Sequence, residues 1–128
     1  MMDHELFQTL IKMEGKTPMT FFPPAAPQDL AAFRCRWPQA PQVLLHLWEI
    51  SDGLEIQVTG TVLYSVREAL GLTAPEGWVP LGYLSFGDPL YLDGDGQVLQ
   101  MDHEKGKLYL SWPTLQNFLE EELEVVEE

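Results

Sequence analysis

The sequence predicts an α+β fold in which a largely antiparallel sheet is packed against N-terminal helices and a C-terminal helix. Three observations predict this class. Apolar residues recur at helical spacing before residue 51, they alternate with polar residues from Leu54 onward, and helical spacing returns after Ser111. Helices, then a meander of strands, then one helix are typical of an α+β domain, with the helices on one face of the sheet. The chain is expected to form a single domain over residues 1–128.

Three helices are expected before the sheet, joined by proline-rich connections. An apolar connector, Thr17–Pro24, separates the first helix from the second. The third helix has Leu44, Leu47 and Trp48 at i, i+3 and i+4, and Asp52-Gly53 ends it. The expected ranges are Asp3–Glu14, Pro27–Arg36 and Pro41–Ile50.

The second half of the chain is expected to be a series of short strands. Ser65 and Glu68 have the spacing of a capping box, which predicts a short helix Val66–Leu70 between two of them. Ser111 and Pro113 open the last helix, with Leu115, Phe118, Leu119 and Leu123 as its apolar stripe. The expected strands are Leu54–Val58, Thr61–Tyr64, Trp78–Leu81, Tyr83–Phe86, Pro89–Leu92, Gln97–Met101 and Lys107–Leu110.

Charge and composition restrict the classes of partner. The formal net charge is −13, from 7 basic and 20 acidic residues, which argues against nucleic acid and anionic membranes as partners. No stretch approaches the roughly 20 apolar residues of a membrane span, and no signal peptide is expected. The single Cys35, expected to be a small buried apolar group, fits a cytoplasmic location.

The acidic excess has two interpretations. The tail at residues 120–128 holds six Glu, so 14 acidic residues remain against 7 basic ones in the rest of the chain. This charge can serve solubility, or it can form a docking face for a basic protein, because opposite fields accelerate encounter.

The candidate catalytic and metal patterns fail on spacing. Asp93, Asp95 and Glu104 occupy positions one, three and twelve of a calcium loop, but position six is Val98 where glycine is needed. A hairpin turn is the alternative, since Asp-Gly favours such turns. The adjacent side chains of the Asp102–Glu104 segment would point to opposite sides. We expect no catalytic residue, no cofactor and no metal, and therefore no enzyme.

Several segments in order resemble a known superfamily. They are Leu44–Gly53, Leu63–Ser65, Leu81-Gly82, Gly87-Asp88, Leu92-Asp93, Asp95–Val98, Asp102–Glu104 and Leu115–Leu119. Together, over residues 27–123, they resemble the SUKH superfamily, which includes bacterial immunity proteins and fungal Smi/Knr-type regulators. The resemblance implies the same fold and a non-catalytic protein-binding module that neutralises a cognate toxin domain.

Two groups of residues are the candidates for partner binding. The acidic group lies in turns or at strand ends and comprises Asp52, Asp88, Asp93, Asp95, Asp102 and Glu104. The aromatic group, Trp37, Trp78 and Trp112, lies at element edges, where tryptophan either anchors a partner or covers the core. The expected partner is a protein, a basic toxin domain. The alternatives are an intracellular scaffold of the Smi/Knr type and, less favoured, a small hydrolase.

Overall fold

The computed structural model describes residues 8, 19–57 and 59–127, with side chains described as far as Glu122. It confirms the α+β class. Its helices are α2 (Pro27–Arg36), α3 (Gln42–Ile50), α4 (Val66–Leu70) and α5 (Leu115–Glu127). Its strands are β1 (Met19–Phe21), β2 (Leu54–Ile56), β3 (Thr61–Leu63), β4 (Val79–Tyr83), β5 (Pro89–Leu92), β6 (Val98–Met101) and β7 (Leu108–Trp112).

Each strand pairs antiparallel with the next one along the chain, which gives a seven-stranded sheet in the order β1 to β7. One cross-strand row runs through all of them: Phe21, Leu54, Leu63, Gly82, Leu90, Gln100 and Leu110. Directly opposed residues of antiparallel strands project to the same face. Because the leucines of β2, β3 and β5 in this row are buried, the row marks the core face of the sheet.

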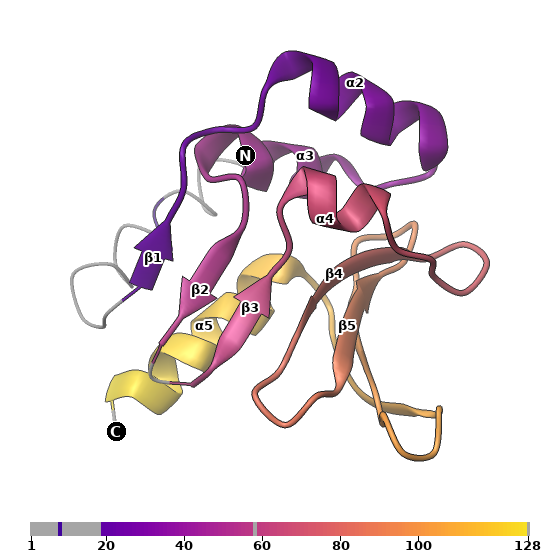
Figure 1. Ribbon diagram of the computed structural model, residues 1–128. Coiled ribbons are helices and arrows are strands. Elements are labelled where there is room, and N and C mark those ends of the chain that lie inside the picture. The colour runs from indigo at the N-terminus through magenta and orange to yellow at the C-terminus, as the bar shows by residue number, and fades with distance from the viewer. Residues whose placement is uncertain (1–7, 9–18, 58, 128) are drawn as a thin grey trace.

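Helix α5 covers the core face, and α3 lies with α2 and α4 at one end of the sheet (Figure 1). Figure 1 shows α5 passing behind β2 and β3, while α2 and α4 lie above one end of the sheet. The core includes Leu44, Leu47 and Trp48 of α3 together with Leu115, Phe118 and Leu119 of α5. Helix α2 adds Phe33, whose ring meets that of Trp48 edge-on at 4.7 Å.

Local sequence signals account for the helix bounds. Helices α2 and α4 have the expected ranges, and α3 begins one residue later than expected, with Pro41 as its N-cap. The capping box is confirmed, because Ser65 Oγ accepts a hydrogen bond from Glu68 N at 3.2 Å and Ser65 N donates to Glu68 Oε1 at 2.9 Å. The expected helix Asp3–Glu14 lies, apart from Gln8, outside the described residues.

Four expectations were wrong. The last helix begins at Leu115 and not at Ser111, because Ser111 belongs to β7. The connector Thr17–Pro24 contains strand β1, which pairs with β2. The two strands expected at Trp78–Leu81 and Tyr83–Phe86 form the single strand β4, because Gly87 N donates to Leu84 O at 2.9 Å and closes a turn there. Cys35 is exposed, because Phe33 of the same helix points into the core and a side chain two positions later points to the other side of the helix.

Among the described residues, no helix combines the length and the apolar character needed to cross a membrane.

Candidate functional site

The second face of the sheet, opposite α5, carries a cross-strand row of both polar and apolar residues (Figure 1). Thr20, Glu55, Val62, Tyr83 and Pro89 are directly opposed across β1 to β5. They alternate along the strands with the residues of the core row and therefore project away from α5. We call this the open face of the sheet.

A groove of about 530 Å³ lies on the open face over β2, β3 and the end of β4. Its apolar surface includes Val62 and the half-exposed rings of Phe22 and Tyr83. Its carboxylates come from three segments: Asp52 before β2, Glu55 on β2 and Glu68 on α4. No described residue that lines it is basic. We call this site, defined by Phe22, Asp52, Glu55, Val62, Glu68 and Tyr83, the acidic groove.

Backbone hydrogen bonds hold two of the three carboxylates in place. Asp52 Oδ1 accepts a bond from Val66 N at 2.9 Å, and Glu68 Oε1 accepts one from Ser65 N at 2.9 Å. Both bonds are made at the N-terminus of α4, where backbone N–H groups have no partner within the helix. Glu55 projects from the middle of β2 and is exposed. Two of the three carboxylates of the groove are therefore held in fixed positions, and the aromatic rings of Phe22 and Tyr83 line the same groove.

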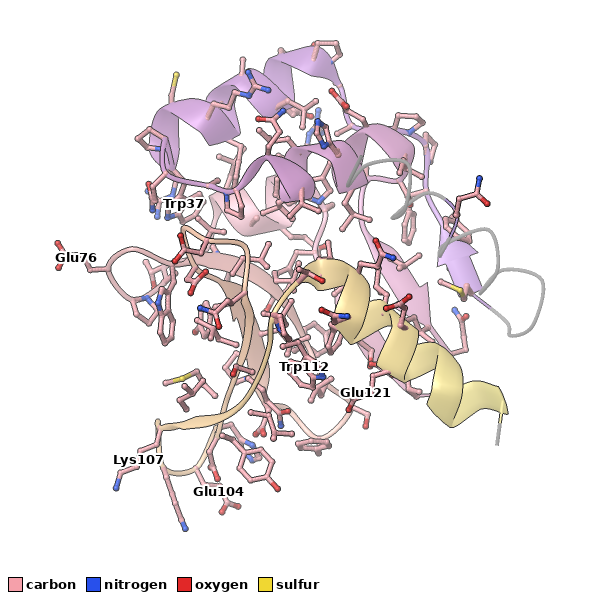
Figure 2. All side chains as sticks on the ribbon, turned by 180° about the vertical axis from the view of Figure 1, so that it is seen from behind. Trp37, Glu76, Glu104, Lys107, Trp112 and Glu121 are labelled. Carbon is pink, nitrogen blue, oxygen red and sulfur yellow. The ribbon has the colours of Figure 1, made fainter. Side chains whose placement is uncertain are left out.

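The six predicted acidic residues do not share one face. Consecutive turns of an antiparallel meander alternate between the two ends of the sheet. Asp52, Asp93 and Asp95 lie at the end where β2 and β6 begin, whereas Asp88, Asp102 and Glu104 lie at the opposite end. Figure 2 shows the turn that carries Glu104 and Lys107 far from Trp37. Only Asp52 of the six lines the acidic groove.

The carboxylate of Asp93 stabilises a hairpin turn. Its Oδ1 accepts bonds from the backbone N–H groups of Asp95 and Gln97 at 2.9 and 3.0 Å, and its Oδ2 accepts one from Gln97 Nε2 at 3.0 Å. Asp102 does the same in the next turn, where Oδ1 accepts from Glu104 N at 2.8 Å. Both carboxylates therefore stabilise their own turns by accepting backbone hydrogen bonds.

Asp88 is buried, which counts against a role in docking. Its Oδ2 accepts from Gln100 Nε2 at 2.7 Å, and its Oδ1 accepts from His103 N at 3.0 Å and lies 2.5 Å from His103 Nδ1. The hydrogen bond from His103 holds the pKa of Asp88 below its usual value, with a further contribution from Gln100. The same bond raises the pKa of His103, against a smaller opposing effect of desolvation.

This cluster is also where a metal ion could be held. One ligand atom each from Asp88, Asp102 and His103 lies within 4.8 Å of the others. The sequence did not indicate this set, because Asp88 comes from a separate turn and only the fold brings it to His103. Both oxygens of Asp88 already accept hydrogen bonds, from Gln100 and from His103, so the cluster is held together without an ion.

The three tryptophans that were predicted as partner-binding residues lie in different surroundings. Trp37 is 8% exposed and covers the core beside Phe33, with the Arg36 guanidinium 4.4 Å from its ring centroid. Trp78 is half-buried, and its ring centroid lies 5.7 Å from that of Tyr91. Tyr91 is paired with Leu99 and lies on the open face. Trp112 is half-buried and donates from Nε1 to Glu121 at 2.7 Å.

Glu55, Glu68, Phe22 and Tyr83 were not predicted as site residues. Alternation marked Glu55 as exposed, but only the register of four strands shows that Val62 and Tyr83 lie beside it.

No protein-family model matches the sequence, and a comparison with curated proteins found no match.

Proposed function

We propose that this chain is a non-catalytic protein-binding module and that its acidic groove receives a basic segment of the partner. The groove carries the proposal, because it combines three carboxylates with two partly exposed aromatic rings and none of its described lining residues is basic. Lysine and arginine have a long apolar stem and a cationic head. The stem would pack on Phe22 or Tyr83, and the head would meet Asp52, Glu55 or Glu68.

The resemblance to the SUKH superfamily supports a more specific form of this proposal. In that form the protein is a cytoplasmic immunity protein, and the partner is a toxin domain with a basic surface. A toxin that acts on nucleic acid needs such a surface. An acidic groove seated on it would exclude the substrate by occupying the same positive field. The alternative, a regulatory scaffold of the Smi/Knr type, would bind its partner without neutralising a toxin.

If the neighbouring upstream gene encodes a toxin domain, the test measures its association and dissociation rates with this protein at two salt concentrations. We expect the association rate to fall as salt rises, while the dissociation rate changes less. Glu55→Lys should slow association at least about tenfold at low salt, since a rim charge acts mainly on that rate. Glu55 suits this test because it is exposed in the middle of β2.

Glu104→Lys is the matched control, because it makes the same charge change at an exposed position at the other end of the sheet. We expect it to change association little. Equal effects of Glu55→Lys and Glu104→Lys would assign the steering to net charge and not to the groove. Neutralisation of Asp93, Asp95 and Asp102 together tests the acidic set predicted from the sequence. If that variant alone slows association, the docking surface lies elsewhere than the groove.

Asp52→Asn adds a neutral variant inside the groove. An amide oxygen can still accept the bond from Val66 N, so the variant removes charge without removing the contact to α4. Slower association of Asp52→Asn with unchanged thermal unfolding would assign the effect to electrostatics.

A further inference from the structure

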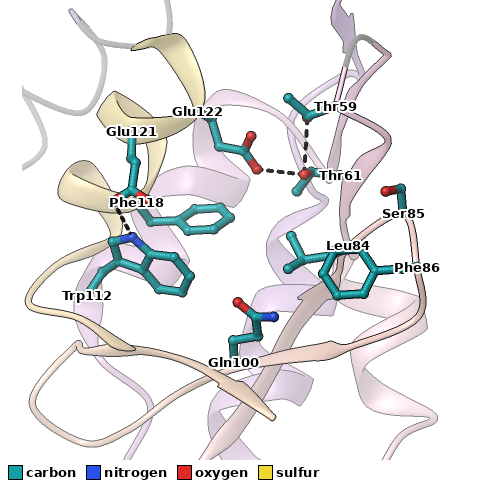
Figure 3. A pocket seen from close by; sticks show the side chains of 10 residues that line it. All are labelled: Thr59, Thr61, Leu84, Ser85, Phe86, Gln100, Trp112, Phe118, Glu121 and Glu122. Carbon is teal, nitrogen blue, oxygen red and sulfur yellow. Dashed lines mark hydrogen bonds between the residues drawn. The ribbon is translucent and has the colours of Figure 1, made fainter. Parts of the chain in front are cut away.

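A second cavity lies on the core face, between the sheet and α5. It has a volume of about 250 Å³. Figure 3 shows Phe118 of α5 on one side, Leu84 and Phe86 of the β4–β5 turn on the other, and Trp112 below. The cavity is therefore apolar over most of its wall, and 59% of Phe86 is exposed at its edge. It lies on the opposite face of the sheet from the acidic groove, so the two sites are independent.

A buried carboxylate faces this apolar space. Glu122 is 9% exposed, and its Oε1 accepts a hydrogen bond from Thr61 Oγ1 at 2.6 Å. Thr61 Oγ1 in turn accepts from Thr59 Oγ1 at 3.1 Å, as Figure 3 shows. The fold places the threonine there because Thr61 is directly opposite Ile56 on the core face.

Glu122 accepts a hydrogen bond, but none of the described residues that line its cavity is basic. The described residues that line the cavity include no Lys, Arg or His, and Glu121 is their other titratable group. The carboxylate of Glu121 is instead bonded to Trp112 Nε1 at 2.7 Å. Burial raises the pKa of Glu122 despite the hydrogen bonds from Thr61 and Thr59, and Glu121 adds to the rise. A carboxylate removed from water is costly unless it is paired with a cation.

We propose that this cavity binds a small organic cation, an ammonium group joined to an apolar body. The ammonium would donate to Glu122 and so supply an opposite charge, which no described residue of the cavity wall supplies. The apolar body would fill the space between Phe118 and Phe86, and aromatic faces near the cation add a favourable interaction. Gln100, which also lines the cavity, offers an amide for a second polar contact. An anionic ligand would be repelled by Glu121 and Glu122.

The same chemistry can come from a free amine or from a lysine side chain of a bound protein. Titration calorimetry on the full chain at pH 7.5 with two probes distinguishes these sources. The probes are 2-phenylethylamine, which stands for a free amine, and Nα-acetyl-lysine amide, which stands for the side chain. The tighter binder identifies the source. 2-Phenylethanol, which has nearly the same shape but no charge, is the reference ligand. We expect the better cation to bind at least about tenfold more tightly than this alcohol, the factor that about 1.4 kcal/mol gives.

Glu122→Gln is the decisive variant. Its amide oxygen can still accept from Thr61, and removing a buried charge should not unfold the protein. We expect this variant to bind the amine no better than the alcohol. Glu121→Gln, at the exposed neighbouring position, should keep most of the preference. Backbone amide shifts in NMR spectra should place the ligand beside Thr61 and Phe118.

A coupled proton provides a second measurement. A bound cation stabilises the ionised form of Glu122, so binding should release protons at pH values near the raised pKa. The measured enthalpy should then depend on the ionisation enthalpy of the buffer, and affinity should weaken as pH falls. Equal binding of alcohol and amine, no binding of either cation at millimolar concentration, or an unchanged preference in Glu122→Gln would overturn the proposal.

Discussion

Nδ1 of His103 lies 2.5 Å from Oδ1 of Asp88, so the turn after β6 is joined to the turn before β5. The backbone N–H of His103 donates to the same oxygen at 3.0 Å. The two turns are 15 residues apart in sequence, and this contact fixes their relative position at one end of the sheet. The pair therefore acts as a side-chain bridge between two hairpins, and its strength depends on the charge of both partners.

The stability of the protein should depend on pH through this pair. The raised pKa of His103 adds stability that is fully present below about pH 6.5, the unfolded value, and is lost as pH rises through the folded pKa. The lowered pKa of Asp88 adds stability that is present above about pH 4 and is lost as pH falls through its folded value. We expect the stabilisation by the pair to be largest between these limits. Thermal unfolding of the wild type and His103→Gln should differ most near pH 5.5, and the difference should shrink as pH rises above about 6.5.

Asp88→Asn provides the control for that experiment. In a double-mutant cycle the coupling between positions 88 and 103 should be present at pH 5.5 and should shrink toward pH 8. A coupling that is the same at both pH values would mean that the contact does not depend on the charge of His103.

Elements with a local signal could be predicted from the sequence. The capping box at Ser65 and Glu68 defined α4, and the proline at Pro27 with the break at Pro38 defined α2. Strand β1 could not be predicted, because its three residues, inside a proline-bounded connector, are too few to show an alternation of apolar and polar side chains. Only its pairing with β2 makes the segment a strand. The sequence predicts a strand at Tyr83–Phe86, where the structure has a turn, because Leu84 and Phe86 alternate with Ser85 and Gly87 as strand residues do.

The site depends on register, which the sequence does not contain. The acidic turns were identified correctly as turns, but their distribution over two ends of the sheet follows from the strand order. Glu55 and Tyr83 are 28 positions apart in sequence. They share one face of the sheet because Glu55 is directly opposite Val62 and Val62 is directly opposite Tyr83. A shift of one residue would move each side chain to the other face.

Phe118→Ala should destabilise the protein by about 3–5 kcal/mol, because it removes a ring that is 2% exposed and leaves a cavity between α5 and the sheet. Phe86→Ala is the matched control, since the same atoms are removed from a side chain that is 59% exposed. That control should stay within about 0.5 kcal/mol of the wild type. Chemical denaturation measures both. Similar losses for the two variants would contradict the placement of α5 in the core.

Gly82→Ala should be strongly destabilising, because a Cβ atom at this position would lie 2.0 Å from the carbonyl oxygen of Val62. The contact is between backbone segments, so no side-chain rotation relieves it, and β3 and β4 would have to separate. We expect a loss at or above the roughly 1–3 kcal/mol of an overpacked core. Gly94→Ala, where nothing lies within 4 Å of the added atom, should be close to neutral. The comparison of the two unfolding midpoints tests the pairing of β3 with β4, and a harmless Gly82→Ala would contradict it.

Metal ions should not be needed for folding. The oxygens of Asp93 accept bonds from Asp95 and Gln97 within their own turn, and those of Asp88 accept bonds from Gln100 and His103. A metal ion would have to break these contacts before it gained new ones. We therefore expect the same thermal unfolding midpoint with excess chelator and with added calcium or zinc, because only a ligand that binds the native state raises it. Asp93→Asn for calcium and Asp88→Asn for zinc are the diagnostic variants. A rise of several degrees in the unfolding midpoint with one ion, lost in the corresponding variant, would show that the ion binds at that residue.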